Sequence, residues 1–195
     1  MKYLTIIFIL LVSCKDLQKT EKTENDNVIT QNNIYHDTSK NVKKKYKKYF
    51  ESDVVEHYFI NIAENDILKI GKKNSPTKEE KLKRNLFISG YPQTIVENNF
   101  EENLIKFKFK KEVFTEVKKK ELDNIFCEKD SSQTSFSSCI PYYRDILIFK
   151  KDNKTVGIAK ICFGCGIIQF TGSKINTQGF GIDSDRKKLE KLLKK

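Results

Sequence analysis

The chain has 195 residues, of which 38% are hydrophobic and 32% charged, and this length suffices for one ordinary domain with a sizeable core. Its formal net charge is +11, but only three of the 37 basic residues are arginines: Arg84, Arg144 and Arg186. We interpret the lysine excess as a compositional bias of a solvated surface, so the charge alone does not indicate a nucleic-acid partner.

The amino-terminal segment predicts export. Lys2 is followed by about ten mostly apolar residues, 3–12, and then by Ser13 and Cys14. A membrane-spanning helix needs about 20 apolar residues, so residues 1–13 are instead predicted to be a signal peptide. The alternative is an uncleaved anchor helix that ends by chance in a cysteine.

The last residues of that segment, Leu11-Val12-Ser13-Cys14, resemble a bacterial lipobox. The resemblance implies that the Cys14 sulfur carries a diacylglyceryl group and that the signal is cut just before this cysteine. It also implies that the freed amine is acylated, and two or three acyl chains anchor a protein stably to a bilayer. Lys15 stands where an aspartate would resemble an inner-membrane retention signal, which favours the outer membrane.

Two segments follow the predicted signal peptide. Residues 14–40 are polar and lack a hydrophobic period, which predicts a lipidated cysteine followed by a disordered tether. Residues 41–51 place apolar side chains at helical spacing between lysines, which predicts a basic amphipathic helix. This helix would either dock on the domain core or lie on anionic headgroups. The residues that would contact the membrane surface are Lys43, Lys44, Lys45, Tyr46, Lys47, Lys48 and Tyr49.

The first elements of the folded domain are a strand and a helix. Residues 54–62 are rich in β-branched and aromatic residues, which predicts a strand, and we interpret its His57 as structural. Ser75 is expected to cap a helix with Pro76 at its first position, and residues 78–86 are predicted to belong to this short helix.

The middle of the chain predicts a second strand and a second helix. Residues 104–113 alternate strictly, so Ile105, Phe107 and Phe109 are expected on the buried face of a strand. Thr115 is expected to cap a helix over residues 116–128, with Leu122, Ile125 and Phe126 turned inward.

The carboxyl-terminal part predicts a hairpin and a closing helix. Residues 145–150 and 155–163 are strand-like and flank a polar turn, and residues 166–171 are expected to add a third strand. A helix is expected from Asp183, with leucines on one face. These elements predict a single α+β domain over residues 41–195, with a largely antiparallel sheet and two to four helices.

Four cysteines remain besides Cys14, and an oxidising compartment favours disulfides between them. The simplest pairing joins Cys162 to Cys165 and Cys127 to Cys139, and cross pairs between these two groups stay open. A redox pair formed by Cys162 and Cys165 is a further alternative, although strand-like residues follow Cys165 where a reactive thiol would have a helix. A zinc site would need a second C-x-x-C, which the chain lacks.

One further resemblance rests on the segment Cys139-Ile-Pro-Tyr-Tyr-Arg144, the hairpin, and Ile161-Cys-Phe-Gly-Cys165. This pattern resembles one in small uncharacterised lipoproteins of Bacteroidetes-type bacteria. It covers residues 139–165, excludes Cys127 and implies a shared cysteine-bearing hairpin and an envelope location, without an activity.

No phosphate loop, dinucleotide loop or placeable pair of carboxylates is recognisable, so we expect no cofactor, no metal and no identifiable catalytic set. The sequence therefore predicts a membrane-anchored envelope lipoprotein that acts as a binding or structural accessory module. Its partners would be the bilayer, through acylated Cys14, and another envelope protein or an anionic surface polymer, but no nucleic acid. The alternative function is that of a thiol-disulfide redox lipoprotein using Cys162 and Cys165.

Overall fold

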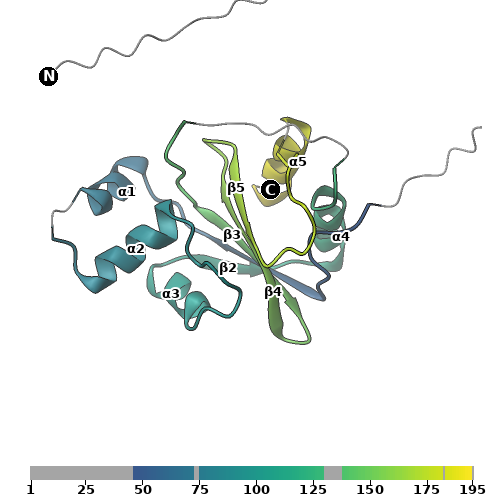
Figure 1. Cartoon of the computed structure of the whole chain (residues 1–195), viewed down its shortest axis with the longest axis horizontal. Helices are drawn as coiled ribbons and strands as arrows, with labels where there is room; N and C mark the ends of the chain where they lie inside the picture. The colour runs from purple at the N-terminus through teal and green to yellow at the C-terminus, as the bar shows by residue number, and fades with distance from the viewer. Residues whose placement is uncertain (1–45, 73–74, 130–137, 182, 195) are drawn as a thin grey trace, which may run out of the picture. The chain divides into compact units, whose positions relative to one another are not determined.

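The strands of the domain form one antiparallel sheet in the order β2-β1-β3-β4-β5 (Figure 1). The computed structural model describes residues 46–72, 75–129, 138–181 and 183–194. The strands are β1 (Val54–Phe59), β2 (Lys110–Val113), β3 (Asp145–Lys151), β4 (Lys154–Cys162) and β5 (Ile167–Thr171). The helices are α1 (Glu64–Gly71), α2 (Lys78–Ile88), α3 (Phe100–Lys106), α4 (Glu116–Ile125) and α5 (Asp183–Leu193). The predicted α+β class and antiparallel sheet are confirmed, with five described helices rather than two to four.

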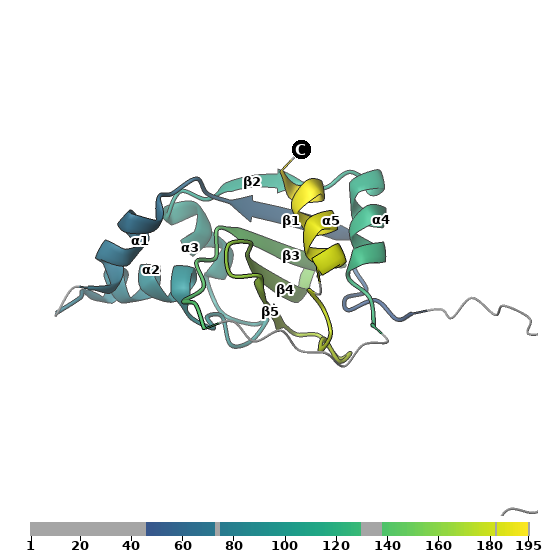
Figure 2. The ribbon, with the colours of Figure 1, turned by 90° about the horizontal axis from the view of Figure 1, so that it is seen from above.

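Helices cover both faces of the sheet, because side chains along a strand point alternately to its two faces. In β3, Leu147 and Phe149 belong to one core cluster, which also holds apolar residues of α4 and α5. Ile146 and Ile148 belong to a second cluster, with residues of α1, α2 and α3. Both views show α4 beside α5 and the first three helices grouped together (Figures 1 and 2). The domain is therefore built as a helix layer, a sheet and a second helix layer.

The predicted hairpin is present and has a two-residue turn. Lys151 pairs with Lys154, and Asp152 and Asn153 between them both have positive φ angles, 49° and 60°. Such left-handed residues form the turn whose twist matches that of the flanking strands, and Asn and Asp adopt this conformation more readily than most residues. The third predicted strand is also present, as β5.

Both of the predicted helices with capped starts are present, as α2 and α4, but α2 is capped by Thr77, two residues after the expected Ser75. The Thr77 side chain accepts a hydrogen bond from the backbone of Glu80, whose carboxylate accepts one from the Thr77 backbone, which together make a capping box. Thr115 caps α4 as predicted, since its side chain accepts a hydrogen bond from the backbone of Lys118, although this helix ends at Ile125 instead of near residue 128. The predicted closing helix is α5.

The prediction of a strand over residues 104–113 is wrong in its first half. Helix α3 occupies residues 100–106, because Phe100 and Leu104 lie four apart and are both buried on one helix face. Lys108, with a φ of 71°, then turns the chain into the short edge strand β2. Phe107 and Phe109 are buried as expected, but Ile105 is 53% exposed.

The described part of the helix expected over residues 41–51 is not helical. Residues 46–51 run without helix, and Lys48 makes an isolated antiparallel bridge with Cys127. Tyr49 and Phe50 are nonetheless buried in the core, so this segment docks on the domain through adjacent aromatic residues. The helical spacing of the apolar residues was therefore a misleading signal.

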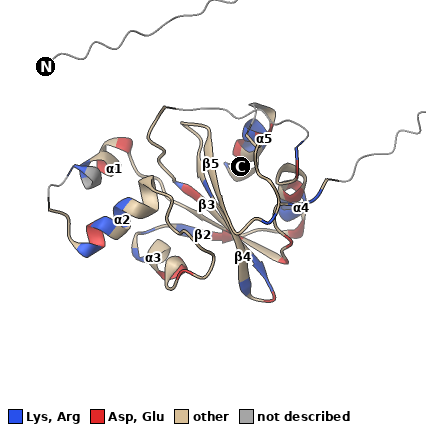
Figure 3. Ribbon diagram, in the orientation of Figure 1, with Lys and Arg blue, Asp and Glu red and all other residues tan. Residues whose placement is uncertain are grey.

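Acidic and basic residues are interspersed on helices α2 and α5 (Figure 3). Several of these charges are paired across elements, for example Lys106 with Glu79 and Lys118 with Glu112. In each of these ion pairs at least one of the two side chains is largely exposed, so each pair contributes little to stability.

Candidate functional site

A cavity of about 890 Å³ lies at the end of the sheet where β1 and β4 end and β3 begins. We call it the cysteine-framed cavity, because Cys139, Cys162 and Cys165 contribute to its wall. Its size falls within the range of small-molecule and peptide-side-chain sites. The cavity wall also includes Phe59, Glu64, Ile140, Arg144, Asp145, Phe163, Glu190 and Lys194.

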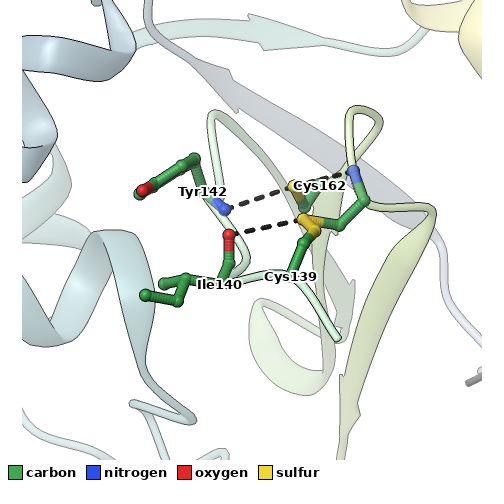
Figure 4. The surroundings of a disulfide bond; sticks show 5 residues. Cys139, Ile140, Tyr142 and Cys162 are labelled. Atoms are coloured by element: carbon green, nitrogen blue, oxygen red, sulfur yellow. Dashed lines mark hydrogen bonds between the residues drawn. A yellow bond between two sulfur atoms is a disulfide. The ribbon is translucent and has the colours of Figure 1, made fainter. Parts of the chain in front are cut away.

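The disulfide at this cavity joins Cys139 to Cys165, whose Cα atoms are 6.1 Å apart (Figure 4). The simplest pairing expected from the sequence, Cys162 with Cys165 and Cys127 with Cys139, is therefore wrong, and one of the cross pairs left open is present. The bond ties the segment before β3 to the turn between β4 and β5. Hydrophobic strands decide this pairing, since they bring residues 26 apart in the chain together.

Cys162 is a free thiol beside that disulfide. It is 3% exposed, and the backbone N–H groups of Tyr142 and Cys165 donate to its sulfur at 3.2 Å and 3.4 Å (Figure 4). The sulfur of Cys165 lies 3.3 Å from the carbonyl oxygen of Ile140. Three cysteine sulfurs are thus gathered at one corner of the cavity.

Cys127 lies elsewhere, at the end of α4. It is also a free cysteine, and its thiol donates to the carbonyl oxygen of Asn124 at 3.4 Å. The structure therefore brings together three of the four predicted cysteine candidates and leaves Cys127 apart.

Arg144 is the cavity residue with the clearest unmet bonding capacity. Its Nε atom is buried and has no hydrogen-bond partner. The charged groups around it are largely committed elsewhere, since Asp145 lies 2.9 Å from His57 Nε2 and Lys194 pairs with Glu190. Within the described ranges, no carboxylate is paired with Arg144. A buried guanidinium nitrogen without a partner is costly, so this position favours an incoming acceptor.

His57 keeps the structural role expected from the sequence, and it has a partner that the sequence did not reveal. Its ring is 2% exposed and lies near the rings of Phe59 and Phe114. The hydrogen bond to Asp145 joins β1 to the first residue of β3, which is the neighbour of Arg144.

Lys160 is a further buried charge, two residues before Cys162 on β4. It is 1% exposed, and its ammonium donates to the carbonyl oxygens of Ser89 and Tyr91 at 2.8 Å and 2.7 Å, and more weakly to that of Asn85. The ammonium also lies 4.3 Å from the centre of the Tyr143 ring. Burial lowers the pKa of Lys160 from its usual 10.5 to about 7. This lysine fixes the loop after α2 onto the sheet.

The sequence reasoning missed both Arg144 and Lys160 as site residues. A signal for Lys160 was available, because a lone lysine within the apolar run of a central strand must find internal partners. The sequence around Arg144 gives no such signal, because whether its guanidinium finds a partner depends on the pairing of β1 with β3.

The residues expected to contact a membrane surface divide into two groups. Tyr46, Lys47, Lys48 and Tyr49 line a second cavity of about 960 Å³, but Tyr49 is only 3% exposed and Lys48 pairs with Asp123 at 2.7 Å. A direct contact of the Tyr49 side chain with headgroups is therefore excluded. Lys43, Lys44, Lys45 and the predicted anchor Cys14 lie outside the described residues.

The described residues hold neither a recognisable metal site nor a membrane-spanning helix. Among them, no group of three or more potential ligand side chains could hold a metal ion. No helix in the same ranges combines the length and the apolar character needed to cross a bilayer.

No family model, no curated protein and no solved structure matches this chain.

Proposed function

We propose that this chain is a lipid-anchored protein of the cell envelope, held through Cys14 in the outer rather than the inner membrane, and that its folded domain is a binding module. The partner we propose is an acidic segment of another envelope protein, which places a carboxylate in the cysteine-framed cavity. The lipobox resemblance supports the anchor, and the chemistry of the cavity supports the ligand class.

The observation that carries the ligand class is the unpartnered guanidinium nitrogen of Arg144. Arginine presents its N–H donors in a planar fork that matches a carboxylate, and such charge-assisted hydrogen bonds are stronger than neutral ones. A carboxylate from a partner would supply the acceptor that the described residues do not.

The remaining wall of the cavity supports a polypeptide partner in preference to a uniform anionic polymer. Phe59, Phe163 and Ile140 are apolar, and Ile140 is 57% exposed at the rim, where an apolar side chain of a partner would cover it. Glu64, on the first turn of α1, would repel a dense row of negative charges. A segment in which acidic and apolar residues alternate satisfies both features.

The ligand class is tested by affinity. A fluorescein-labelled peptide of alternating glutamate and phenylalanine is titrated with the full-length chain in detergent, and anisotropy reports binding. Because a hydrogen bond to a charged group contributes roughly 1.5–3 kcal/mol, Arg144→Gln is expected to weaken binding about 10- to 100-fold. Arg84→Gln, on the exposed surface of α2, is the matched control and should change affinity less than about twofold.

Two results would count against this proposal. Equal loss of affinity in both variants would mean that the peptide binds the overall positive charge. Stronger binding of polyglutamate than of the alternating peptide would shift the assignment to an anionic surface polymer.

The anchor is tested separately, in cells that carry the lipoprotein-processing enzymes. The wild-type chain is expected to fractionate with membranes and to incorporate a labelled fatty acid, whereas Cys14→Ser should lose the label. A Cys14→Ser protein that keeps its label would overturn the proposed lipidation.

A further inference from the structure

We propose that Cys162 is an internal exchange thiol that opens the Cys139–Cys165 disulfide and sets Cys139 free as a thiol at the cysteine-framed cavity. This activity goes beyond ligand binding and does not depend on it. It rests on the placement of a free cysteine next to a disulfide, and the proposed binding function uses neither.

Cys162 and Cys165 lie close together. Cys162 is the last residue of β4, and Cys165 lies in the turn that leads to β5. The backbone N–H of Cys165 donates to the Cys162 sulfur at 3.4 Å, so this turn folds the second cysteine back over the first (Figure 4). A disulfide between residues three apart needs only a side-chain rotation and an adjustment of this turn.

The Cys162 thiol is held in place and shielded from solvent. Hydrogen bonds from Tyr142 and Cys165 fix the Cys162 sulfur, and the residue is 3% exposed. Large reagents in solution therefore reach this sulfur poorly. The Cys162 sulfur can instead reach the neighbouring Cys165 sulfur, which favours exchange within the chain over reaction with an outside disulfide.

The reaction balances without an outside oxidant or reductant. The Cys162 thiol loses its proton and its sulfur attacks the Cys165 sulfur, so that a Cys162–Cys165 bond forms while the Cys139–Cys165 bond breaks. Cys139 leaves with the electron pair of the broken bond and takes up a proton. One thiol and one disulfide are present before the step and after it.

After the exchange, the free thiol is that of Cys139, which is accessible, instead of that of Cys162, which is buried. Cys139 lies in an exposed part of the chain and, like Cys162, contributes to the cavity wall. In the exchanged form the segment before β3 is no longer tied to the turn after β4. The free Cys139 can then attack a disulfide of a docked partner, so that a mixed disulfide forms while one cysteine of the partner leaves as a thiol, which would make the complex covalent.

Tryptic peptides distinguish the two forms. Cys139 lies in peptide 130–144, Cys162 and Cys165 lie together in peptide 161–174, and Cys127 lies in peptide 121–129. The full-length chain in detergent is incubated without reductant at about pH 8 with excess maleimide, then quenched at low pH and digested over a time course. The expected result is a slow gain of label on peptide 130–144, with peptide 161–174 unlabelled and lighter by two hydrogen atoms.

Two variants identify the attacking thiol. Cys162→Ala is expected to slow the labelling of Cys139 at least about tenfold, whereas Cys127→Ala should leave the rate unchanged. Circular dichroism checks that each variant is folded. If a variant does not fold, the lighter peptide 161–174 of the wild-type chain still shows directly that the Cys162–Cys165 bond has formed.

Three outcomes would overturn the proposal. Cys139 could stay unlabelled as long as the wild-type chain is folded, or it could be labelled equally fast in Cys162→Ala. Alternatively, Cys162 itself could become labelled while the Cys139–Cys165 bond stays intact. Each outcome leaves the binding test unaffected, because that test follows Arg144 and a peptide.

Discussion

Replacing Lys160 by methionine should remove a pH dependence of stability that the wild-type domain carries. The lysine is buried on β4 under three carbonyl oxygens and the Tyr143 ring, and none of its described partners is a carboxylate. Burial lowers its pKa from 10.5 to about 7, so the folded domain holds this proton more weakly than the unfolded chain does. Methionine keeps the length of the side chain but cannot titrate.

Proton linkage gives the direction and the magnitude of this pH dependence of the free energy of unfolding. Between about pH 7 and the unfolded pKa of 10.5, the unfolded chain binds more protons than the folded domain, so the free energy of unfolding rises with pH. Below about pH 7 both states are protonated, and the full cost of the buried charge is present. For this single group, the gain from about pH 7 to about pH 9 is about 2 kcal/mol.

The assay is urea denaturation of wild type, Lys160→Met and the control Lys154→Met at both pH values. Lys154 is exposed on the same strand. From about pH 7 to about pH 9, the free energy of unfolding of wild type and of Lys154→Met should rise by about 2 kcal/mol more than that of Lys160→Met. Lys160→Met will also be destabilised overall, because two carbonyl oxygens lose their donor. An identical pH dependence in wild type and Lys160→Met would refute the reasoning.

Three further predictions concern stability. Gly157→Ala would place a Cβ atom too close to the Phe50 ring and should lower the free energy of unfolding by about 1–3 kcal/mol, measured by urea titration. An unchanged midpoint would contradict the packing of Phe50, in the segment before β1, against this glycine. Thr77→Ala removes half of the capping box and should cost about 1 kcal/mol, measured by thermal unfolding, whereas an unaltered melting temperature would mean that α2 does not depend on its cap. Cys139→Ala opens the bond to Cys165, which closes a loop across 26 positions, and should lower the free energy of unfolding by about 3.5 kcal/mol; a chain as stable after this change would show that the loop is held by other contacts.

Elements with local signals were predictable from the sequence. Thr115 could be named as a helix cap because the hydrogen bond that its side chain accepts from the third residue forms within one turn. The start of α2 was predicted by the same local chemistry, but its cap is Thr77 and not the expected Ser75. The hairpin turn at Asp152 and Asn153 is likewise local. These signals do not depend on what the rest of the chain does.

Elements decided by packing were not predictable in this way. Residues 104–109 alternate as a strand would, yet the preceding Phe100 and Leu104 form a buried helical face and override the alternation. Around Tyr49 and Phe50, helical spacing was misleading because both adjacent rings pack into the same core cluster although the chain there is not helical.

The candidate site shows the same division. Its cysteines could be named from the sequence, since they are few and chemically distinct. Their pairing could not, because it depends on the register that brings the segment before β3 against the end of β4. The isolation of Arg144 has the same origin, as it results from the commitment of Asp145 to His57 across two strands.

The most direct test of the account is whether the Arg144 side chain receives an anionic partner. Because the chain has only three arginines, ¹⁵N-arginine labelling gives three Nε–H resonances, which Arg144→Lys, Arg84→Lys and Arg186→Lys assign. Titration with the alternating glutamate and phenylalanine peptide should shift the Arg144 resonance in a saturable manner and leave that of Arg84 in place. An Arg144 resonance that does not move, or moves only as much as that of Arg84, would contradict the proposed binding site.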